Sequence, residues 1–518
     1  MKHKNSLRLL ILTLIGMIMY SCQKDDEINP QLVEQQAPTE GLIKLGEKLE
    51  NPYSLENMQK ALNNLKSSKL SAKSSSVNDI EITTTHLYLR FKPKNEDELN
   101  ILKADSTFVL YDYPLDYEIT ENGYFYKDPE VTGEQPTYQY CAIPVDKKLP
   151  DGVEHELLAK LFIPDEDSDD DTENKIANKS FATDLVDALV DEALRITNNL
   201  EESSTQGKSS LAARRSKWRP AGTIKVWDDM LNTFVGVEGV KVRARRWFTT
   251  HRGIANASGY YSCDGRFRRD ANYSIDWERY EFALQDGWLN GATYNGSKKR
   301  GNWDLNLKDD KQAYYATIFR AAHHYYYKDI KGLRRPPQNS FWRTQMKIRA
   351  YLQNVSEDNA LGTHNSGWRA FGLHSPIKIY TYNRQSIDTY STVIHELAHA
   401  SHWNMNRSSF RDIPDNEARV KESWARGVEW ELTRMVYPNY RAPEIRPKYT
   451  LVVMDMIDND NRFGNTFSFG ESVNGYTIRQ IEDALDGQKS WINWKNNIKN
   501  KYENGTENNL DALFDYWD

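Results

Sequence analysis

The segment His395-Glu396-Leu397-Ala398-His399 constrains the fold of this chain more than any other stretch of its sequence. Two histidines four residues apart lie one turn apart on the same face of an α-helix, where both can bind one metal ion. Glu396 is rotated by about 100° from His395 on that helix, so its carboxylate can meet a metal-bound water instead of the metal. The segment therefore predicts a helix with His395 and His399 as metal ligands and Glu396 as the catalytic base.

The sequence before this segment predicts a strand and a turn ahead of the helix. Residues Ile377–Tyr382 alternate as a half-buried strand does. Residues 383–388 are typical of a turn, and Ser386 or Asp388 could cap the helix. A strand followed closely by such a helix is the order that zinc peptidases use. The alternative is an amphipathic helix whose two histidines are satisfied by other hydrogen bonds.

A catalytic zinc site needs a third protein ligand and leaves the fourth position for water. His402 shares the helix face, but it lies roughly 10 Å further along the helix axis than His395, too far for one ion. Glu422 is the better candidate, with Glu417 and Glu429 in reserve. We expect Glu429 instead to orient a ligand histidine through a hydrogen bond.

Glu422 lies in a second predicted helix, which Pro414 and Asp415 open. Glu422 borders the apolar stripe of this helix beside Ala418 and Ala425. These small side chains let the helix approach another backbone closely, as a short carboxylate needs in order to reach a metal on a different helix. The alternative is a solvated glutamate. The stripe consists of Val420, Trp424, Val428, Leu432 and Met435.

The two motifs together, His395-Glu396-x-x-His399 and Glu422-Ser423-Trp424-Ala425, resemble the gluzincin class of zinc metallopeptidases. The resemblance covers residues 289–518. It implies that Glu422 is the third ligand, that each chain binds one Zn²⁺, and that the reaction is peptide-bond hydrolysis. In this mechanism Glu396 takes the proton of a water and delivers it to the leaving amine. The class often has an Asp four residues after the ligand glutamate, where this chain has Arg426.

The same resemblance implies two further features of a peptidase site. An oxyanion-stabilising donor is expected, and the sequence offers Tyr437, Tyr440, Tyr449 and His374 without deciding among them. In gluzincin-like folds the edge strand ahead of the active helix binds the substrate backbone. Residues 377–382 are therefore candidates for pairing with an extended peptide, with an ordinary sheet edge as the alternative.

The first residues of the chain predict export and lipid attachment. Met1-Lys2-His3-Lys4 is a charged start, Leu9–Met19 is a short apolar run, and Ser21 precedes Cys22. This order is typical of a lipoprotein signal peptide over residues 1–21. The following segment, Gln23–Glu27, resembles the export signal of Bacteroidetes surface lipoproteins. The resemblance implies a lipid anchor at Cys22 in a bacterial outer membrane, with the protein facing outward or, alternatively, the periplasm.

A chain of 518 residues implies several domains, and we expect a multidomain α+β protein. Residues 22–78 would be a lipidated tether and linker, and 79–215 an N-terminal α+β domain of unknown role. Short strands punctuated by glycine predict a small β-sandwich over 216–288. It resembles a carboxypeptidase regulatory-like, transthyretin-type module, which implies a spacer or folding role. Residues 289–518 would form a zincin-like α+β metallopeptidase domain.

Shorter patterns fill in this C-terminal domain. Residues 311–327 predict a helix and 347–352 a strand of its sheet. His323 and His324, near the end of that helix, could face the site, although helix-end histidines are more often at the surface. Residues 455–460 are acidic but lack the glycine and the terminal glutamate of an EF-hand loop, so we expect a polar loop there.

Charge and cysteine content exclude two other classes. The net charge of −7 is spread over the chain and gives no nucleic-acid footprint. Apart from Cys22, the only cysteines are Cys141 and Cys263. They fall in different predicted domains, so a disulfide framework is not expected.

Three functions fit these features. The leading hypothesis is a surface zinc metallopeptidase that hydrolyses polypeptides or glycoproteins. The second is a non-enzymatic binding or adhesion lipoprotein with a structural zinc. The third is a glycoprotein-directed peptidase that reads a sugar beside the scissile bond. The third hypothesis is suggested by the expected surface location and by the aromatic content, including Tyr325–Tyr327. The alternative is that these aromatic residues form a buried core.

Overall fold

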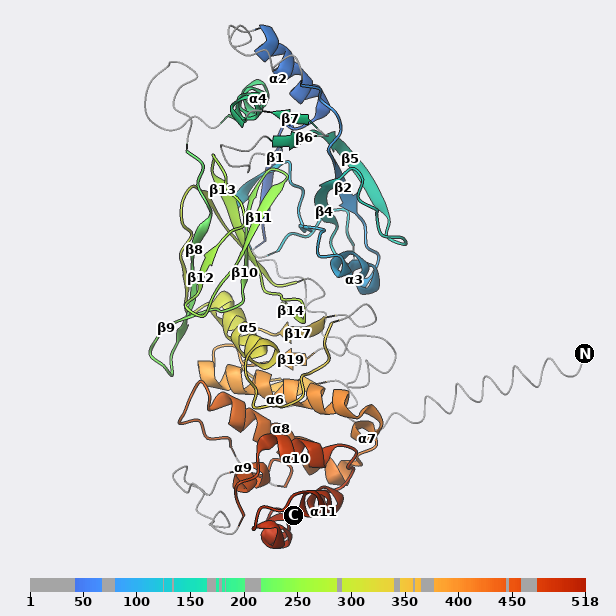
Figure 1. The fold of residues 1–518 in the computed structure, drawn as a ribbon, viewed down its shortest axis with the longest axis vertical. Coiled ribbons are helices and arrows are strands. Elements are labelled where there is room, and N and C mark those ends of the chain that lie inside the picture. Colours follow the sequence, from blue (N-terminus) through green and yellow to red (C-terminus); the bar gives the residue numbers. More distant parts are fainter. Residues whose placement is uncertain are drawn as a thin grey trace, which may run out of the picture. The chain divides into compact units, whose positions relative to one another are not determined.

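Helices and β-sheets together build the described part of the chain, which confirms the expected multidomain α+β class (Figure 1). The predicted signal peptide and Cys22 lie outside the described residues. Among the residues that are described, no helix combines the length and the apolar character needed to cross a membrane. The computed structural model describes residues 42–67, 80–123, 125–132, 135–164, 174–176, 179–181, 183–200, 216–286, 291–339, 345–356, 359–364, 377–443, 447–457 and 473–518.

The N-terminal region, residues 42–200, is built around strand β2 (His86–Phe91). It begins earlier than the expected residue 79, because residues 42–67, expected to be part of a tether and linker, form a strand and a helix that contribute to its core. This strand lies between β4 (Gln139–Pro144) and β5 (His155–Leu161) and is antiparallel to both. Helices α2 (Leu55–Ser67) and α4 (Thr183–Ile196) pack against each other. The remaining elements are α3 (Glu96–Ala104) and two strand pairs, β1 (Lys44–Lys48) with β3 (Tyr117–Glu121) and β6 (Asn174–Ile176) with β7 (Lys179–Phe181).

The expected β-sandwich consists of two sheets, with strand orders β11-β10-β13-β15 and β12-β8-β16, and β9 added beside β8. Buried and partly exposed residues alternate along β8, so one face of its sheet forms core. The strands are β8 (Ala221–Asp228), β9 (Thr233–Gly236), β10 (Lys241–Arg246), β11 (Thr249–Ile254), β12 (Tyr260–Ser262), β13 (Ala271–Asp276), β15 (Thr293–Lys299) and β16 (Leu305–Leu307).

The C-terminal region has a four-stranded sheet with the strand order β14-β17-β19-β18. Its first three strands, β14 (Phe282–Gln285), β17 (Met346–Ala350) and β19 (Ile377–Ile379), are parallel. β18 (Gly362–His364) is antiparallel to β19 and forms the edge. The strand ahead of the helix with His395 and His399 is therefore an inner strand, and the expectation that residues 377–382 form the edge is wrong. A three-residue strand from an intervening segment takes the edge position.

Strand pairing does not follow the boundary expected between residues 288 and 289. β14 lies before that boundary but pairs with β17 of the C-terminal sheet. β15 and β16 lie after it but pair with β13 and β8 of the sandwich. The chain thus leaves the sandwich for one strand and then returns. Sequence periodicity could not show this exchange, because it identifies strands but not their partners.

Helices α5 (Lys311–Tyr327), α6 (Ser386–Met405) and α8 (Ala418–Thr433) follow in the C-terminal region, and both α5 and α8 pack on α6. The helix expected over 311–327 is confirmed as α5. The smaller helices are α7 (Arg407–Arg411), η4 (Asp415–Glu417), α9 (Val452–Ile457), α10 (Ile478–Leu485), α11 (Trp491–Lys501), η6 (Glu507–Asn509) and α12 (Leu510–Tyr516).

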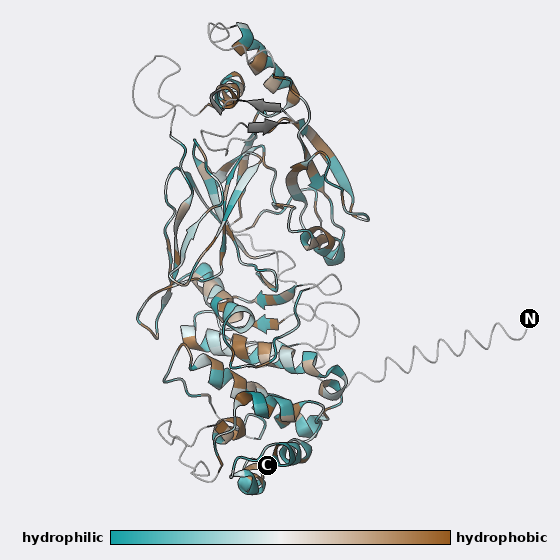
Figure 2. Cartoon of the chain, in the orientation of Figure 1, coloured by the Kyte–Doolittle hydropathy of each residue, from teal (hydrophilic) through white to brown (hydrophobic). Residues whose placement is uncertain are grey.

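The sandwich and the C-terminal region share one hydrophobic core, which contains Val242 of β10 and Leu397 of α6 in a single contiguous cluster. Trp277, after β13, is fully buried at the joint between them. Its indole Nε1 donates to Oε1 of Gln312 on α5 at 2.6 Å, and its ring centroid lies 5.8 Å from that of Phe319 on the same helix. Figure 2 shows hydrophobic and hydrophilic segments alternating along these helices and strands, as amphipathic elements require.

The N-terminal region has two separate core clusters of its own. One of them takes in Phe248, from the turn between β10 and β11 of the sandwich. The other contacts across this second joint are mostly polar. Arginines of the sandwich, Arg243 and Arg245, donate to backbone carbonyls of residues 110 and 115 in the N-terminal region.

Cys141 in β4 and Cys263 after β12 are free and buried. No disulfide joins these two residues in the structure. Burial raises the pKa of both thiols to about 12, so both stay protonated in the folded chain.

Candidate metal centre

Helix α6 carries the two predicted histidine ligands and is buried along almost its whole length, from Ile387 to Trp403. It begins at Ser386, and its N-cap Gln385 makes no side-chain capping bond. The expected caps are therefore wrong, because Ser386 and Asp388 lie inside the first turn. His395, Glu396 and His399 are each no more than 7% exposed. Their chemistry is sheltered from bulk water.

Helix α8 follows the short helix η4 and buries the predicted stripe of Val420, Trp424, Val428 and Leu432. Met435 lies beyond the end of the helix and is 42% exposed, so the stripe ends one turn earlier than expected. Ala425 is fully buried, and α8 packs closely on α6. Glu422 projects from the edge of this stripe toward α6.

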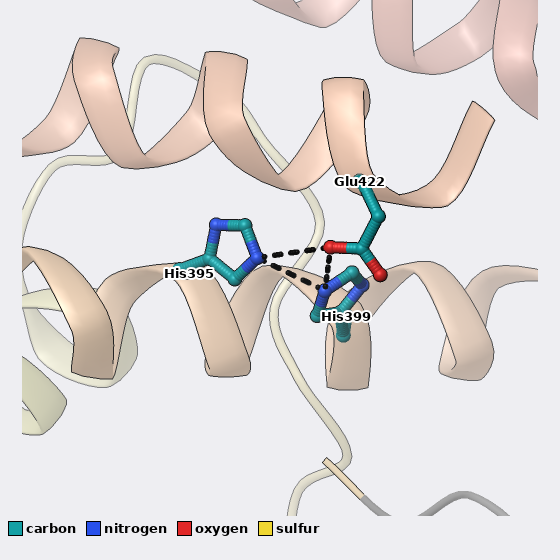
Figure 3. Close-up of side chains that lie close together, drawn as sticks. All are labelled: His395, His399 and Glu422. Atoms are coloured by element: carbon teal, nitrogen blue, oxygen red, sulfur yellow. Dashed lines mark hydrogen bonds and ion pairs between the residues drawn. The ribbon is translucent and has the colours of Figure 1, made fainter. Parts of the chain in front are cut away.

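Three side chains converge between the two helices, His395 and His399 from α6 and Glu422 from α8 (Figure 3). The Nε2 atoms of the histidines are 3.1 Å apart, and Oε2 of Glu422 lies 3.3 Å and 3.2 Å from them. Zinc–ligand bonds of about 2.0–2.1 Å at tetrahedral angles place donor atoms about 3.3 Å apart. The triad therefore outlines one face of a coordination tetrahedron and is compatible with a zinc site.

The contact predicted between Glu429 and a ligand histidine is present. Oε2 of Glu429 accepts from Nδ1 of His395 at 2.9 Å, while Oε1 accepts from Nη1 of Arg426 at 2.9 Å and from the Tyr440 hydroxyl. Burial opposes the charge on Glu429, but Arg426 and His395 outweigh it and lower the pKa of the carboxyl. With Nδ1 as the donor, His395 keeps the lone pair on Nε2 directed into the triad.

Charge within the triad favours proton binding by the histidine and ionisation of the carboxyl. Burial disfavours the charged imidazolium, yet the carboxylates of Glu422 and Glu429 raise the pKa of His395 to about 9. Burial likewise opposes ionisation of Glu422, but His399 and His395 hold its pKa well below the usual range. A divalent cation would replace the proton that this carboxylate-rich pocket attracts.

Glu396 lies beside the triad, where burial raises its pKa to about 6 against the opposing effect of His395 and His399. A Cβ at Gly362, the first residue of β18, would lie 2.7 Å from Oε1 of Glu396 and 2.7 Å from Cγ2 of Thr392. β18 therefore crosses α6 at the carboxylate with no room for a side chain. Sequence periodicity cannot reveal this strand, because three residues carry no periodic signal.

Tyr449 is the described tyrosine that lies at the triad. Its ring centroid is 5.9 Å from that of His395, and the Arg426 guanidinium lies 5.1 Å from the Tyr449 ring centroid. Burial, together with the carboxylates of Glu422 and Glu396, raises the pKa of Tyr449. The hydroxyl therefore stays protonated, and it is hydrogen-bonded to the carboxylate of Glu422.

Two other candidate donors, Tyr437 and Tyr440, have hydrogen-bond partners of their own away from Tyr449. Tyr437 donates to Asp228, and Tyr440 donates to Glu429. His374 lies outside the described residues. Another histidine that the sequence analysis did not select, His364 of β18, stacks parallel to His399 with ring centroids 6.5 Å apart.

The remaining sequence candidates lie away from the triad. His402 packs edge-on against Phe410, and burial lowers its pKa to about 3. Glu417 accepts a hydrogen bond from the backbone of Trp491.

Three other predicted features do not contribute to the triad. His323 and His324 are buried in α5 and do not join the triad. Asp455 accepts from the indole of Trp517, and residues 458–460 lie outside the described residues. Tyr325 and Tyr326 are buried, which agrees with the alternative of an aromatic core for this run.

Comparison of the chain with models of known families, with curated proteins and with solved structures gives no match. The centre is therefore defined by its own geometry. Two imidazoles and one carboxylate lie at tetrahedral spacing, and a buried carboxyl group of raised pKa lies beside them.

Proposed function

We propose that this protein is a gluzincin-type zinc metallopeptidase that hydrolyses peptide bonds in polypeptide or glycoprotein substrates. The observation that carries the proposal is the tetrahedral spacing of His395, His399 and Glu422 with Glu396 beside them. Nitrogen and carboxylate donors of this kind suit Zn²⁺, with one ion per chain.

The number of ligands supports a catalytic metal over a structural one. Structural zinc sites are usually closed by four protein ligands, whereas catalytic sites have three and an open position. The metal-binding group found among the described residues contains three. This count favours the peptidase over an adhesion lipoprotein with a structural zinc.

A bound Zn²⁺ supplies Lewis acidity, which polarises the scissile carbonyl and makes a water more acidic. Glu396 acts as the base that accepts the proton of that water and later delivers it to the leaving amine. Its buried position and raised pKa suit both halves of this transfer near neutral pH. Glu429 holds His395 in the tautomer that binds metal.

Two further groups complete the proposed site. The Tyr449 hydroxyl, which is hydrogen-bonded to Glu422, can turn to donate a hydrogen bond to the carbonyl oxygen as negative charge develops there. β18 is an edge strand over Glu396, so its outer side can pair with an extended substrate backbone. This role passes to β18 from residues 377–382, because β19 already has partners on both sides.

We also propose a lipid anchor at Cys22 that holds the enzyme at the outer surface of a bacterial outer membrane. The support is the signal-peptide pattern of residues 1–21 and the acidic segment after Cys22. Replacing Cys22 with Ser should abolish incorporation of labelled fatty acid. Protease treatment of intact cells should then separate an outward-facing protein from one that faces the periplasm.

The deciding experiment compares the soluble chain beginning after Cys22 with its Glu396→Gln form on a peptide and glycopeptide library. Glu396→Gln should keep one zinc per chain but lower hydrolysis by about 10²–10⁴-fold, because only the proton transfer is lost. Asp415→Asn, at an exposed carboxylate near α8, is the matched control and should keep full activity. Equal zinc loading with no cleavage by any form would contradict the proposal.

Glycoprotein-directed cleavage stays a prediction within this proposal. Enzymatic removal of the glycans from a cleaved glycopeptide should abolish cleavage if the enzyme reads a sugar. Unchanged cleavage of the deglycosylated peptide would leave the enzyme a general peptidase.

A further inference from the structure

The turn that ends β8 of the sandwich carries two consecutive aspartates, Asp228 and Asp229, beside the start of α6 (Figure 1). Asp228 is fully buried although it is a carboxylate. A buried carboxylate is costly unless it is paired and hydrogen-bonded. Its partners therefore show what this residue does.

All side-chain partners of Asp228 belong to elements that flank α6. Oδ2 accepts from Nη1 of Arg320 on α5 at 2.9 Å and from the Tyr437 hydroxyl, after α8, at 2.7 Å. Oδ1 accepts from the backbone N–H of Leu231 at 3.1 Å, which fixes the turn itself. One side chain of the sandwich thus ties together both neighbours of the helix that carries the metal ligands.

These neighbours meet on Tyr390 of α6, which is 2% exposed. The guanidinium of Arg320 lies 5.8 Å from the Tyr390 ring centroid, and the Tyr437 ring meets it edge-on at 5.4 Å. The Tyr390 hydroxyl bonds Nδ1 of His324 at 2.7 Å. Tyr390 precedes His395 by five residues, or about 7.5 Å along the helix, so its placement sets that of the first ligand.

Asp229 acts on the same helix at its first residue. Its Oδ1 accepts from the backbone N–H of Ser386 at 2.8 Å. The N-cap of α6, Gln385, makes no capping bond of its own. The sandwich therefore supplies the capping carboxylate, which also interacts favourably with the helix dipole.

We propose that Asp228 and Asp229 are positioning residues of the metal site and that the sandwich, through them, sets the position of α6. Asp228 acts through Arg320, Tyr437 and Tyr390, and Asp229 acts through the first turn of α6. The module is then a working part of the centre and not a spacer. This inference rests on the proposed metal site.

The test measures the metal site directly, with cobalt(II) and zinc as probes and without any substrate. Asp228→Asn should weaken metal binding by about tenfold, the lower end of the cost of losing an orienting contact. It should also shift the visible absorption of the cobalt form, because the ligands move. Tyr437→Phe removes only one of the bonds to Asp228, so it should fold if Asp228→Asn does not and should give a smaller shift. Asp229→Ala should weaken metal binding by a few fold.

Asp304→Ala is the matched control, because Asp304 bonds the backbone and hydroxyl of Thr223 within the sandwich itself. It should lower stability without changing the cobalt spectrum. Wild-type metal affinity and wild-type spectra in Asp229→Ala and Tyr437→Phe would overturn the inference. The two aspartates would then contribute to stability alone.

A second measurement keeps this inference separate from the proposed function. If the unmodified chain binds neither cobalt nor zinc, the proposed function fails. Hydrogen exchange of the amides of residues 390–400 still tests the coupling. Faster exchange in Asp229→Ala and Tyr437→Phe, but not in Asp304→Ala, supports it, and equal exchange in all three overturns it.

Discussion

The β-sandwich meets its two neighbours in different ways. Toward the C-terminal region it shares one hydrophobic core, and the two exchange strands across the sequence boundary. Toward the N-terminal region it places Phe248 of one turn in that region's core and otherwise makes mostly polar contacts, with arginines that donate to backbone carbonyls and aspartates. Shared cores unfold cooperatively, whereas polar joints separate more easily. The sandwich and the C-terminal region should therefore behave as one folding unit and the N-terminal region as another.

The largest expected effect comes from cutting the chain at the two joints. A chain that begins at residue 289 loses β14 and all partners of β15 and β16, so it should be unfolded and bind no stoichiometric zinc. A chain that begins at residue 216 should fold and bind one zinc. Circular dichroism and metal analysis of both chains would check this. If the chain from residue 289 folds and binds zinc, the sandwich and the C-terminal region are not one folding unit.

A substitution at the shared core should come next in size. Trp277→Ala removes a fully buried side chain and its bond to Gln312, so it should cost about 3–5 kcal/mol of unfolding free energy. Phe91→Ala is a matched truncation in the N-terminal region. In denaturant titrations Trp277→Ala should move the transition in which the metal site is lost. Phe91→Ala should move only the other transition, and a shift of both by either variant would contradict two units.

Acid should weaken the shared-core unit through its buried histidines. Burial lowers the pKa of His323 and His324 to about 4, below the 6.5 of an exposed histidine. As pH falls from 6.5 toward 4, these two histidines become protonated in the unfolded chain but stay neutral in the folded chain. Each residue should therefore remove about 1.4 kcal/mol of stability per pH unit in this window. Unfolding free energies from urea titrations at several pH values should depend on pH less steeply in His324→Gln, by that amount. An unchanged dependence on pH would refute the assignment.

The smallest effect is expected at the polar joint. Arg269 donates to Asp191 of α4, whose carboxylate side chain is 58% exposed. Exposed ion pairs contribute about 0–1 kcal/mol. Arg269→Ala should shift neither unfolding transition by more than this, and the shift should shrink in high salt. A loss of several kcal/mol would show that this joint is stronger than its chemistry indicates.

The parts of the site that could be predicted are those that depend on helix periodicity. His395 and His399 share a helix face by spacing alone, and Glu422 is marked by small neighbours beside an apolar stripe. Glu429 lies two turns beyond Glu422, within reach of the same histidine. Each of these inferences needs one helix or a pair of helices in contact.

The unpredicted parts depend on which elements pair across the chain. Nothing in Phe282–Gln285 distinguishes a sandwich strand from a strand of the C-terminal sheet, because both are buried apolar runs. Gly362 is one glycine among many until β18 is placed over Glu396. Asp228 has the sequence context of a turn, and only the packed structure shows that the turn enters the core beside α5. Non-local contact, and not local propensity, decides these positions.

The two buried thiols can report the opening rate of each folding unit separately. Cys141 belongs to the N-terminal region and Cys263 to the sandwich, and both are free. A thiol of raised pKa in a closed core reacts with an alkylating reagent only when its surroundings open. The mass gained at each cysteine over time thus records two opening rates in a single sample of a chain that lacks Cys22. The ratio of these rates shows how independently the two units open.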